Sequence, residues 1–594
     1  MVIKMRYNEG LVAGKYYTET VTDFKGIRFT DNASGDELYR CRNIALDAPG
    51  VLRPRLGRSV IRPVISGGGI YSDEALCWTE NGRFYYGGSQ IDGLYLTTGK
   101  KHICRLGKYI LIFPDGVYFN TYDFTDHGNI SASFSVSGTV YLQTVDSELS
   151  SVGTFEILQE LPEEAESGKL CAVPGDSGDG IYSLKRYDGA RWTDVRTYIK
   201  LTLNNIGASF KVGDLLETEE PDGVLGSCIR VSYIEDNALY CEGVALKSSV
   251  SSLKLKRVMP LLDCAAVSGD RVWGCRYGLD RDGGFVCRVY ASAPGDPLNW
   301  SSIAENGGLY TDIAGSGAFS GICDFMGSPV LFREDGLIEL AISGGRIVQA
   351  AIRGEGAERG AMQSIITLGG VLYYKSRDAV CSYDGSYPKR VSSQLGKLGA
   401  SDDGAPAGIY NGRYYIKLSP ENGDAGIYSY DPQSKIWQCE DDPGVIAFAM
   451  RNDLLYAMTG GQNGKIILWD PAGADETERN YCISAGYPIN EGAVTWNLET
   501  GKLGRSELKG MYPIRLCLRV RGVESGMSAG LIFDEADSAE KLISIPAGTN
   551  GTIVLPVSAV RSDTVRLFIS GSGDADILGY SLEYTEESEV RGWN

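Results

Sequence analysis

Histidine and paired cysteines are what this sequence has least of. Only His102 and His127 occur among 594 residues, and no Cys-x-x-Cys is present. A structural zinc site needs four closely spaced Cys or His ligands, and a Ser-His-Asp triad needs a histidine beside an activated serine. Neither histidine has such a neighbourhood in the sequence. We therefore expect no zinc site and no catalytic triad of this kind.

Long apolar runs are also missing. No segment is long enough to cross a bilayer, and Met1-Val2-Ile3-Lys4 does not begin a signal peptide. The fourteen cysteines stand singly within apolar runs, as Cys77 and Cys381 do. We therefore expect buried, reduced thiols in a protein made in a reducing cytosol, with no disulfides.

Helical periodicity is the third absence. No long segment places apolar residues at the 3.6-residue spacing of an amphipathic helix. Glycine (76 residues) and tyrosine (35 residues) are abundant instead, which suits turn-rich β structure packed by aromatic side chains. The sequence predicts an all-β fold.

A repeat organises the chain between residues 326 and 470. A turn, an apolar run, a second turn and a second apolar run begin at residues 327, 369, 411 and 452, which are 42, 42 and 41 residues apart. A period in the low forties with hairpins in each unit is typical of β-propeller blades, which stack to bury one another's faces. Further hairpins start near residues 74, 107 and 269. We predict about seven blades, and six to eight also fit.

The repeat is interrupted and flanked by other β segments. Residues 130–258 contain strands and a hairpin out of phase with the repeat, which predicts a β module inserted into a blade. After about residue 490 the pattern changes: Ile514, Leu516, Leu518 and Val520 alternate with polar residues, as in a strand with one buried face. The predicted domains are an N-terminal arm or docking segment (1–60), the first part of the propeller (61–129), the inserted β domain (130–258), the second part of the propeller (259–490) and a C-terminal β-sandwich (491–594).

We find no sequence motif typical of a catalytic or ligand-binding site. The carboxylate pairs Asp402-Asp403 and Asp441-Asp442 are sequence neighbours in loops and cannot face each other across a substrate. Asp574 and Asp576 could offer oxygen ligands to calcium, but a solvated turn is the simpler interpretation. We assign no catalytic, cofactor-binding or metal-binding residue, and we expect a protein that is not an enzyme.

One segment of this acidic chain is rich in arginine. The net charge is −19, yet the segment 53–62, here called the arginine segment, holds Arg53, Arg55, Arg58 and Arg62. One interpretation is a solvated strand edge. The other is a contact segment for an acidic neighbouring protein. A strongly acidic chain is not expected to hold nucleic acid, because phosphate affinity is built from Lys and Arg.

Three segments resemble one protein family. They run from Arg42-Asn43-Ile44 to Gly57-Arg58, from Ser292-Ala293-Pro294 to Asn299-Trp300, and over Ser382-Tyr383-Asp384-Gly385. Together they are similar to the β-propeller nozzle or hub proteins of short-tailed bacteriophages. The resemblance implies a structural virion protein without cofactors, assembled in the host cytoplasm. It also implies a ring, a hexamer in that family, below the portal and adaptor. Tail fibres or spikes would be further partners, and DNA would be retained and ejected through the ring without specific binding.

A second hypothesis stays open beside this one. A β-propeller can also serve as a receptor- or glycan-binding adhesin or tail-fibre component. In that case exposed Trp and Tyr side chains in blade loops would stack on sugar rings.

Overall fold

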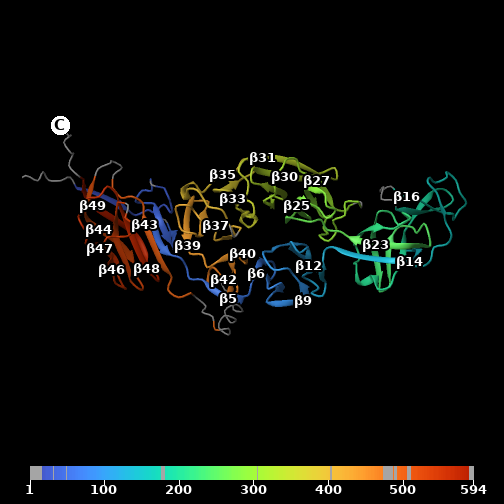
Figure 1. The fold of residues 1–594 in the computed structure, drawn as a ribbon, viewed down its shortest axis with the longest axis horizontal. Coiled ribbons are helices and arrows are strands. Elements are labelled where there is room, and N and C mark those ends of the chain that lie inside the picture. Colours follow the sequence, from blue (N-terminus) through green and yellow to red (C-terminus); the bar gives the residue numbers. More distant parts are fainter. Residues whose placement is uncertain are drawn as a thin grey trace, which may run out of the picture. The chain divides into compact units, whose positions relative to one another are not determined.

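The computed structural model describes residues 16–30, 32–48, 50–175, 181–303, 306–401, 404–471, 486, 491–504, 510–534 and 536–586. In these ranges the regular elements are β-strands, apart from three single-turn 3₁₀ helices at Ile206–Ala208, Met362–Ser364 and Ser393–Leu395. This confirms the all-β prediction (Figure 1). The chain forms two compact units, residues 1–81 with 360–594 and residues 82–359. Each unit is described by itself.

The first unit contains three blade-like groups of four antiparallel strands. They are β32 (Ile366–Leu368), β33 (Val371–Lys375), β34 (Val380–Tyr383) and β35 (Lys389–Arg390); β36 (Ala407–Tyr410), β37 (Arg413–Leu418), β38 (Gly426–Asp431) and β39 (Ile436–Glu440); and β40 (Val445–Arg451), β41 (Leu454–Thr459), β42 (Gly464–Leu468) and β5 (Ser59–Val64). A hairpin of β6 (Gly67–Ser72) and β7 (Leu76–Glu80) belongs to the same unit. Antiparallel four-stranded sheets of this kind are propeller blades, so the β-propeller prediction is confirmed.

Tight turns set the repeat seen in the sequence. In the first turn of three successive blades, both central residues have positive φ: Gly369 and Gly370, Asn411 and Gly412, Asn452 and Asp453. Two-residue turns with two positive φ angles match the twist of a β-hairpin, and Gly, Asn and Asp tolerate that backbone best. All seven hairpin starts expected from the sequence fall at the first turn of a sheet or hairpin: 74, 107, 269, 327, 369, 411 and 452.

Tyrosines fill the blade cores of the first unit. Tyr414 and Tyr428 are fully buried, and each phenol donates a 2.7 Å hydrogen bond to a backbone carbonyl, of Ser364 and Asp424 respectively. Burying a tyrosine is favourable only when its hydroxyl finds such a partner. These two tyrosines therefore fill the blade cores without leaving a buried hydroxyl group unpaired.

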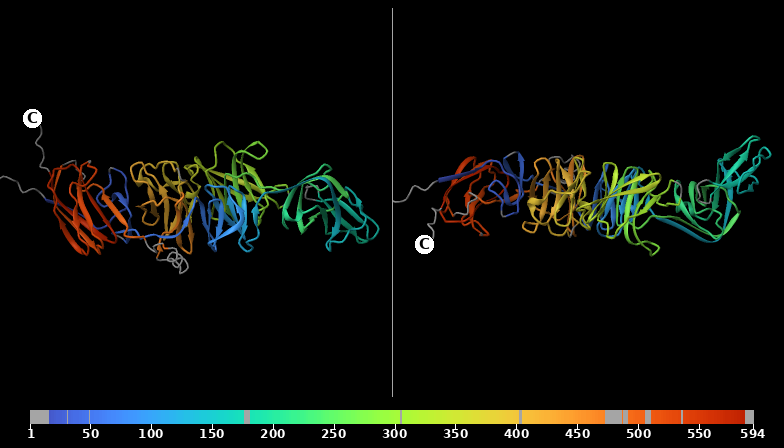
Figure 2. Two further views of the ribbon diagram at one scale, coloured as in Figure 1. Left: turned by 60° about the horizontal axis from the view of Figure 1, so that its bottom comes forward. Right: turned by 90° about the horizontal axis from the view of Figure 1, so that it is seen from above.

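The C-terminal sandwich contains strands from both ends of the chain. Its sheets combine β1 (Tyr16–Val21), β2 (Leu38–Arg42), β3 (Ile44–Ala48) and β4 (Val51–Pro54) with β43 (Thr495–Thr500), β44 (Met511–Arg521), β45 (Met527–Phe533), β46 (Ile543–Ile545), β47 (Gly551–Leu555), β48 (Val565–Ser572) and β49 (Asp576–Glu586). β1 pairs with β49 and β2 with β43, both antiparallel. The blue N-terminal strands accordingly lie beside the orange and red ones in both views of Figure 2. Within the predicted N-terminal arm (1–60), strands β1, β2 and β4 thus pair with the C-terminal strands, and β3 pairs with β4 and with β39 of a blade. A docking role for residues 1–60 stays a prediction.

A bulge explains one departure from the expected strand pattern. In β44, Leu516, Leu518 and Val520 are buried as predicted, but Ile514 is 41% exposed. The pairing of β44 with β49 shifts register between Pro513 and Arg515. A bulge inserts one residue into a strand and moves the preceding side chains to the other face.

The second unit contains three further blades and a hairpin. The hairpin is β8 (Arg83–Tyr86) and β9 (Ser89–Tyr95). The blades are β10 (His102–Leu106), β11 (Tyr109–Phe113), β12 (Val117–Asn120) and β13 (His127–Asn129); β24 (Cys264–Ser268), β25 (Arg271–Leu279), β26 (Phe285–Ala291) and β27 (Leu309–Asp312); and β28 (Gly321–Phe325), β29 (Ser328–Arg333), β30 (Gly336–Ser343) and β31 (Arg346–Arg353).

Strands between β13 and β24 form sheets of their own. A closed barrel has the order β14 (Ala132–Asp146), β19 (Thr197–Thr202), β22 (Ala238–Glu242), β21 (Cys228–Glu235), β20 (Leu215–Glu219) and β23 (Ser249–Arg257). A smaller sheet has the order β15 (Glu156–Ile157), β16 (Leu170–Pro174), β17 (Tyr182–Tyr187) and β18 (Trp192–Val195). No described strand of this insert pairs with a blade. The strands that enter and leave the insert, β14 and β23, pair with each other (Figure 1).

A buried ion pair fastens the base of the insert. Arg257 binds both carboxylate oxygens of Asp214 at 2.7–2.8 Å and donates to the carbonyl of Ile130, where the chain enters the insert. Asn299, in the loop after β26, accepts from the backbone amide of Leu215 at 2.8 Å. The barrel is therefore held against a blade by polar contacts, rather than joined to it by the chain alone.

Candidate functional site

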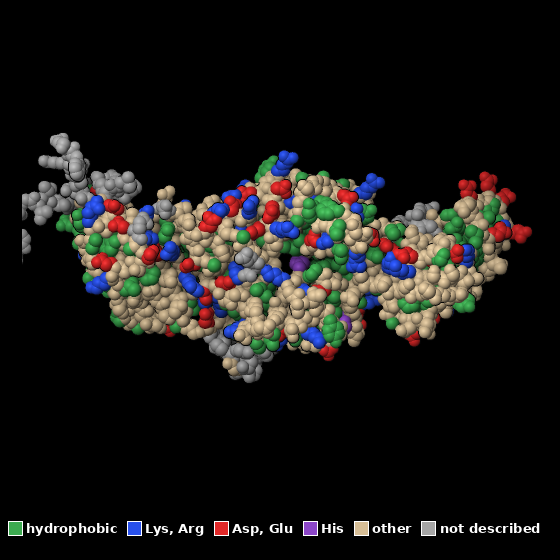
Figure 3. Space-filling model, viewed as in Figure 1, with side chains coloured by type: hydrophobic (Ala, Val, Ile, Leu, Met, Phe, Trp, Pro, Cys, Tyr) green, Lys and Arg blue, Asp and Glu red, His purple; other side chains and the backbone are tan. Residues whose placement is uncertain are grey.

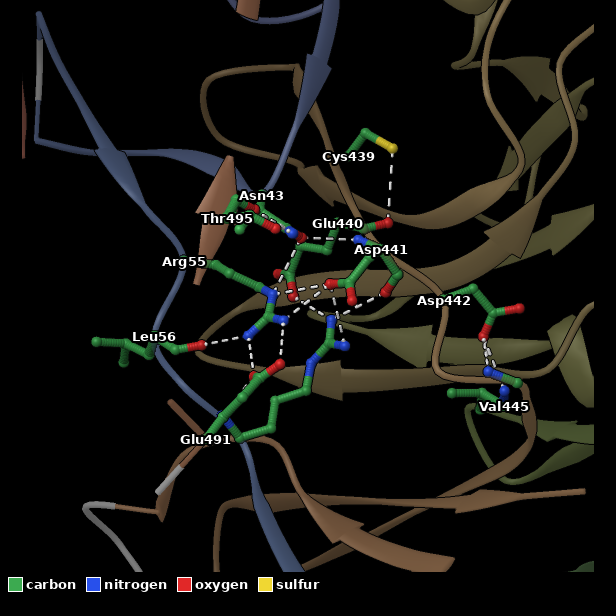
Figure 4. A network of polar contacts seen from close by, with 12 residues as sticks. Asn43, Arg55, Leu56, Cys439, Glu440, Asp441, Asp442, Val445, Glu491 and Thr495 are labelled. Atoms are coloured by element: carbon green, nitrogen blue, oxygen red, sulfur yellow. Dashed lines mark hydrogen bonds and ion pairs between the residues drawn. The ribbon is translucent and has the colours of Figure 1, made fainter. Parts of the chain in front are cut away.

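The arginine segment lies in the first unit and runs from the end of β4 through the following loop into β5. Arg55 and Arg58 leave the strands there and turn inward, so that 3% and 5% of their side chains are exposed. Figure 4 shows Arg55 among Asn43, Asp441 and Glu491. The acidic residues come from the end of β39 and the loop after it, and from the start of the described segment 491–504. Chain segments nearly 400 residues apart thus meet at one charged cluster.

Hydrogen-bond geometry in this cluster is tight. Arg55 binds the two carboxylate oxygens of Glu491 at 2.7 and 3.1 Å and an oxygen of Asp441 at 2.9 Å. Arg58 donates to Glu440 at 2.8 Å, and its guanidinium carbon lies 3.8 Å from the centre of the Trp469 ring. Bidentate and stacked contacts of this kind are specific to arginine, because its guanidinium is planar.

The cluster perturbs the titration of its members. Burial by itself would raise the pKa of Glu491, but the hydrogen bonds and charges of Arg55 and Arg58 outweigh it and lower the pKa below its ordinary value. Burial would lower the pKa of Arg55, and Glu491 and Asp441 raise it instead. Both shifts favour the charged forms of Glu491 and Arg55.

The two outer arginines of the segment have different surroundings. Arg53 pairs with Asp576 at 2.6 Å and keeps 42% of its side chain exposed. Arg62 lies over the ring of Trp78, 4.6 Å from its centre. The acidic neighbour that the sequence suggested for the arginine segment is, for Arg53, Arg55 and Arg58, another part of the same chain. Arg55 and Arg58 are therefore corrected from contact residues to buried structural residues. Contact of Arg53 and Arg62 with another protein stays a prediction.

The remaining candidates from the sequence do not form a catalytic or metal site. His102 is partly buried in β10, and burial lowers its pKa to about 4, so it is neutral at physiological pH. Asp576, which the sequence suggested as a calcium ligand, instead accepts hydrogen bonds from the guanidinium groups of Arg53 and Arg521. Within the described ranges no group of three His, Cys, Asp or Glu side chains could hold a metal ion.

Of the two carboxylate pairs noted in the sequence, one lies in the described ranges, and it does not form a catalytic pair. Asp441 and Asp442 have different partners: Asp441 accepts a hydrogen bond from Arg55, and Asp442 accepts one from the backbone amide of Val445. The pair Asp402-Asp403 lies outside the described residues.

A cavity that the sequence did not indicate lies in the insert. It has a volume of about 640 Å³ and separates the small sheet from the barrel wall. Ile181, Leu184 and Leu215 give it apolar walls, and a polar set surrounds them. That set consists of Tyr182, Ser183, Asp194, Arg196, Thr197, Arg230, Glu242 and Asn306. Sites for small ligands in proteins have this size and this mixture of apolar walls with a few polar groups.

Exposed aromatic side chains are tyrosines rather than tryptophans. Of the seven tryptophans in the described ranges, six are buried, and Trp192 is half-buried with its Nε1 donating to the carbonyl of Pro162. Tyr95, Tyr122 and Tyr387 are 67–72% exposed. Stacking on sugars, as expected for the adhesin hypothesis, would therefore depend on tyrosine or phenylalanine in the described ranges, where Phe124 and Phe285 are also exposed.

The surface itself carries mixed charge. On the face drawn in Figure 3, Lys and Arg side chains are interspersed with Asp and Glu on both units. Interspersed charges favour solubility and give no extended basic track for a polyanion. Among the described elements no helix is long and apolar enough to cross a membrane.

The fold and these sites define a multidomain all-β protein that contains a β-propeller. No protein-family model matches the sequence, and no curated protein matches it. Solved structures similar to the chain include PorZ, a surface component of the type-IX secretion system of Porphyromonas gingivalis. It is 9% identical with a TM-score of 0.24, over 89% of this chain and 76% of that one. A Trypanosoma rangeli sialidase is 9% identical with a TM-score of 0.23, over 76% of this chain and 96% of the sialidase. A glycoside hydrolase family 43 arabinofuranohydrolase of Bacillus subtilis is 12% identical with a TM-score of 0.18, over 55% of this chain and 95% of the hydrolase.

These likenesses correct one expectation. The sequence led us to expect a protein that is not an enzyme, but the similar structures include a glycoside hydrolase and a sialidase. The exclusion of an enzyme is therefore withdrawn. TM-scores this low carry no argument about substrate, partner or mechanism.

Proposed function

We propose that this chain is a structural protein of a bacteriophage tail, a β-propeller subunit of a nozzle or hub. In this role copies of the chain form a ring below the portal and adaptor, and tail fibres or spikes attach to the same assembly. The genome is retained and ejected through the ring. The motifs quoted from residues 42–58, 292–300 and 382–385 suggest this family.

One observation carries the proposal: three of the four arginines in the arginine segment, Arg53, Arg55 and Arg58, form ion pairs with carboxylates of the same chain. Each phosphate contact of a DNA-binding protein needs an available cation and adds about one unit to the salt dependence of binding. A wall that guides DNA without holding it should offer few such cations. A net charge of −19 and internally paired arginines meet that requirement.

The test is binding of a labelled DNA duplex to the purified chain, followed by fluorescence anisotropy from low to physiological salt. The proposal predicts no measurable binding near 0.15 M salt, on the order of physiological ionic strength. Binding at that salt, with a steep salt dependence that the double substitution Arg53→Glu, Arg62→Glu abolishes, would contradict it.

A second candidate function is binding of a receptor glycan. The 640 Å³ cavity of the insert favours it, because its apolar walls and polar rim can contact a sugar ring and its hydroxyl groups. Incubating the chain with an array of bacterial surface glycans tests it. A tail nozzle with an accessory glycan-binding insert would show both the ring and the binding, so the two candidates are not exclusive.

A further inference from the structure

The cavity of the insert is lined by a cation, Arg230, that has no partner among the described residues. Arg230 is half-buried and lines the cavity wall. Among the described residues the structure gives its guanidinium no ion pair and no hydrogen bond. Other arginines of the same unit are paired, for example Arg257 with Asp214 and Arg288 with Asp312. A partly desolvated charge without a counter-ion raises the free energy of the unliganded protein, and an anionic ligand would remove that cost.

Strand alternation explains why Arg230 points into the cavity. Ile229 and Val231, its neighbours in β21, belong to the apolar core inside the barrel. Successive side chains of a strand point to opposite faces, so Arg230 faces outward. Leu215, which is paired with Arg230 across β20 and β21, lies on the same outer face and is also buried against the cavity. The guanidinium is therefore presented next to an apolar surface.

The charged side chains at the rim of the cavity form only solvent-exposed ion pairs. Arg196 and Glu242 approach to 3.7 Å, and their side chains are 70% and 49% exposed. Asp194 is paired with Lys185 and is also largely exposed. Exposed ion pairs contribute little to stability, so these side chains can turn toward a ligand at low cost. The two carboxylates at the rim, Asp194 and Glu242, would repel a doubly charged phosphate more strongly than a singly charged carboxylate.

We propose that this cavity binds a sugar carrying a carboxylate, with Arg230 binding the carboxylate. The walls formed by Leu215, Ile181 and Tyr182 contact the apolar face of the ring, and Asp194, Glu242 and Asn306 bind hydroxyl groups at the rim. A carboxylic sugar combines these three features, since it has an apolar ring face, several hydroxyls and one negative charge. The inference rests on the second candidate function, binding of a glycan, and names the class of that glycan.

The experiment uses two probes that differ only in the carboxylate, methyl β-glucuronide and methyl β-glucoside. Saturation-transfer NMR on the full-length chain measures both, because it detects weak ligands of a large protein. We expect the glucuronide to bind at least about 10-fold more tightly, as a charge-assisted hydrogen bond contributes. Arg230→Met should remove this preference. The control Arg191→Met, an 81% exposed arginine outside the cavity lining, should keep it.

Each contrary outcome is distinct. Equal binding of the two probes by the wild-type chain would overturn the carboxylate inference and leave glycan binding intact. No binding of either probe would refute both. A preference for the glucuronide that survives Arg230→Met would remove the role of Arg230. If Arg230→Met unfolds the insert, the comparison of the two probes on the wild-type chain still decides the inference.

Discussion

Arg58 and Glu440 form a buried ion pair at 2.8 Å, although 382 residues separate them in the chain. The pair joins the segment between β4 and β5 to the end of β39, and the Trp469 ring covers the guanidinium. It therefore fastens the N-terminal segment to two blades of the first unit. A contact of this kind cannot be recognised from the local sequence, because both partners look like ordinary surface residues there.

Removing the cation should therefore weaken the blades. Arg58→Met leaves Glu440 buried without its partner, and we expect the free energy of opening of β39 and β42 to fall by about 3–5 kcal/mol. Hydrogen exchange followed by mass spectrometry measures this locally, without assuming two-state unfolding of a multidomain chain. The matched control is Arg53→Met, whose pair with Asp576 is half-exposed and should cost about 0–1 kcal/mol. Equal effects of the two substitutions would show that burial of Arg58 does not matter.

Acid should loosen the same cluster. The pKa of Glu491 is lowered in the folded state, so this carboxylate stabilises the fold fully above its unfolded pKa of about 4.3. That contribution disappears as the pH falls through the lower folded pKa. We expect the opening free energy of the segment around Arg55 to drop as the pH falls below about 4.3, the unfolded pKa of a glutamate. In Glu491→Gln this drop should be smaller. Glu421→Gln, which removes an exposed partner of Lys397, should leave the wild-type pH profile unchanged.

The strands and turns were predictable where the local sequence determines them. Gly369-Gly370 and Asn411-Gly412 favour the backbone of a hairpin turn, and the regular spacing of such turns made the blade repeat recognisable in the sequence. The sequence predicted that the propeller begins near β5, but it did not predict the pairing of β5 with β42, because the two strands are about 400 residues apart. The burial of Arg55 and Arg58 was also not predicted, because their acidic partners are about 400 residues away in the sequence. The cavity of the insert is lined by residues from several strands, and no spacing in the sequence brings them together.

The thiols offer an independent check of the predicted compartment. The thirteen cysteines in the described ranges are free, and nine of them are buried. Burial raises the pKa of the Cys41 and Cys104 thiols to about 12, which makes the reactive thiolate scarce. We expect slow labelling of the native chain by a thiol reagent and labelling of all fourteen cysteines in denaturant. A denatured count several thiols short of fourteen would reveal disulfides.

Arg53 and Arg62 remain the residues of the arginine segment that can reach a neighbouring protein. Reversing both to Glu should reduce incorporation of the chain into phage particles. The melting temperature of the isolated chain should stay within a few degrees of the wild type, because neither side chain is buried. Quantitative mass spectrometry of purified particles measures incorporation. Normal incorporation of the double variant would refute the contact role of these two arginines.

Electron microscopy of the purified chain, and of phage particles that contain it, tests the central claim most directly. The proposed nozzle role predicts a closed symmetric ring with a channel wide enough for duplex DNA. On particles, antibody labelling should place this ring below the portal and adaptor. Isolated monomers or trimeric spikes, with label at the tips of fibres, would contradict the nozzle role and favour a receptor-binding protein.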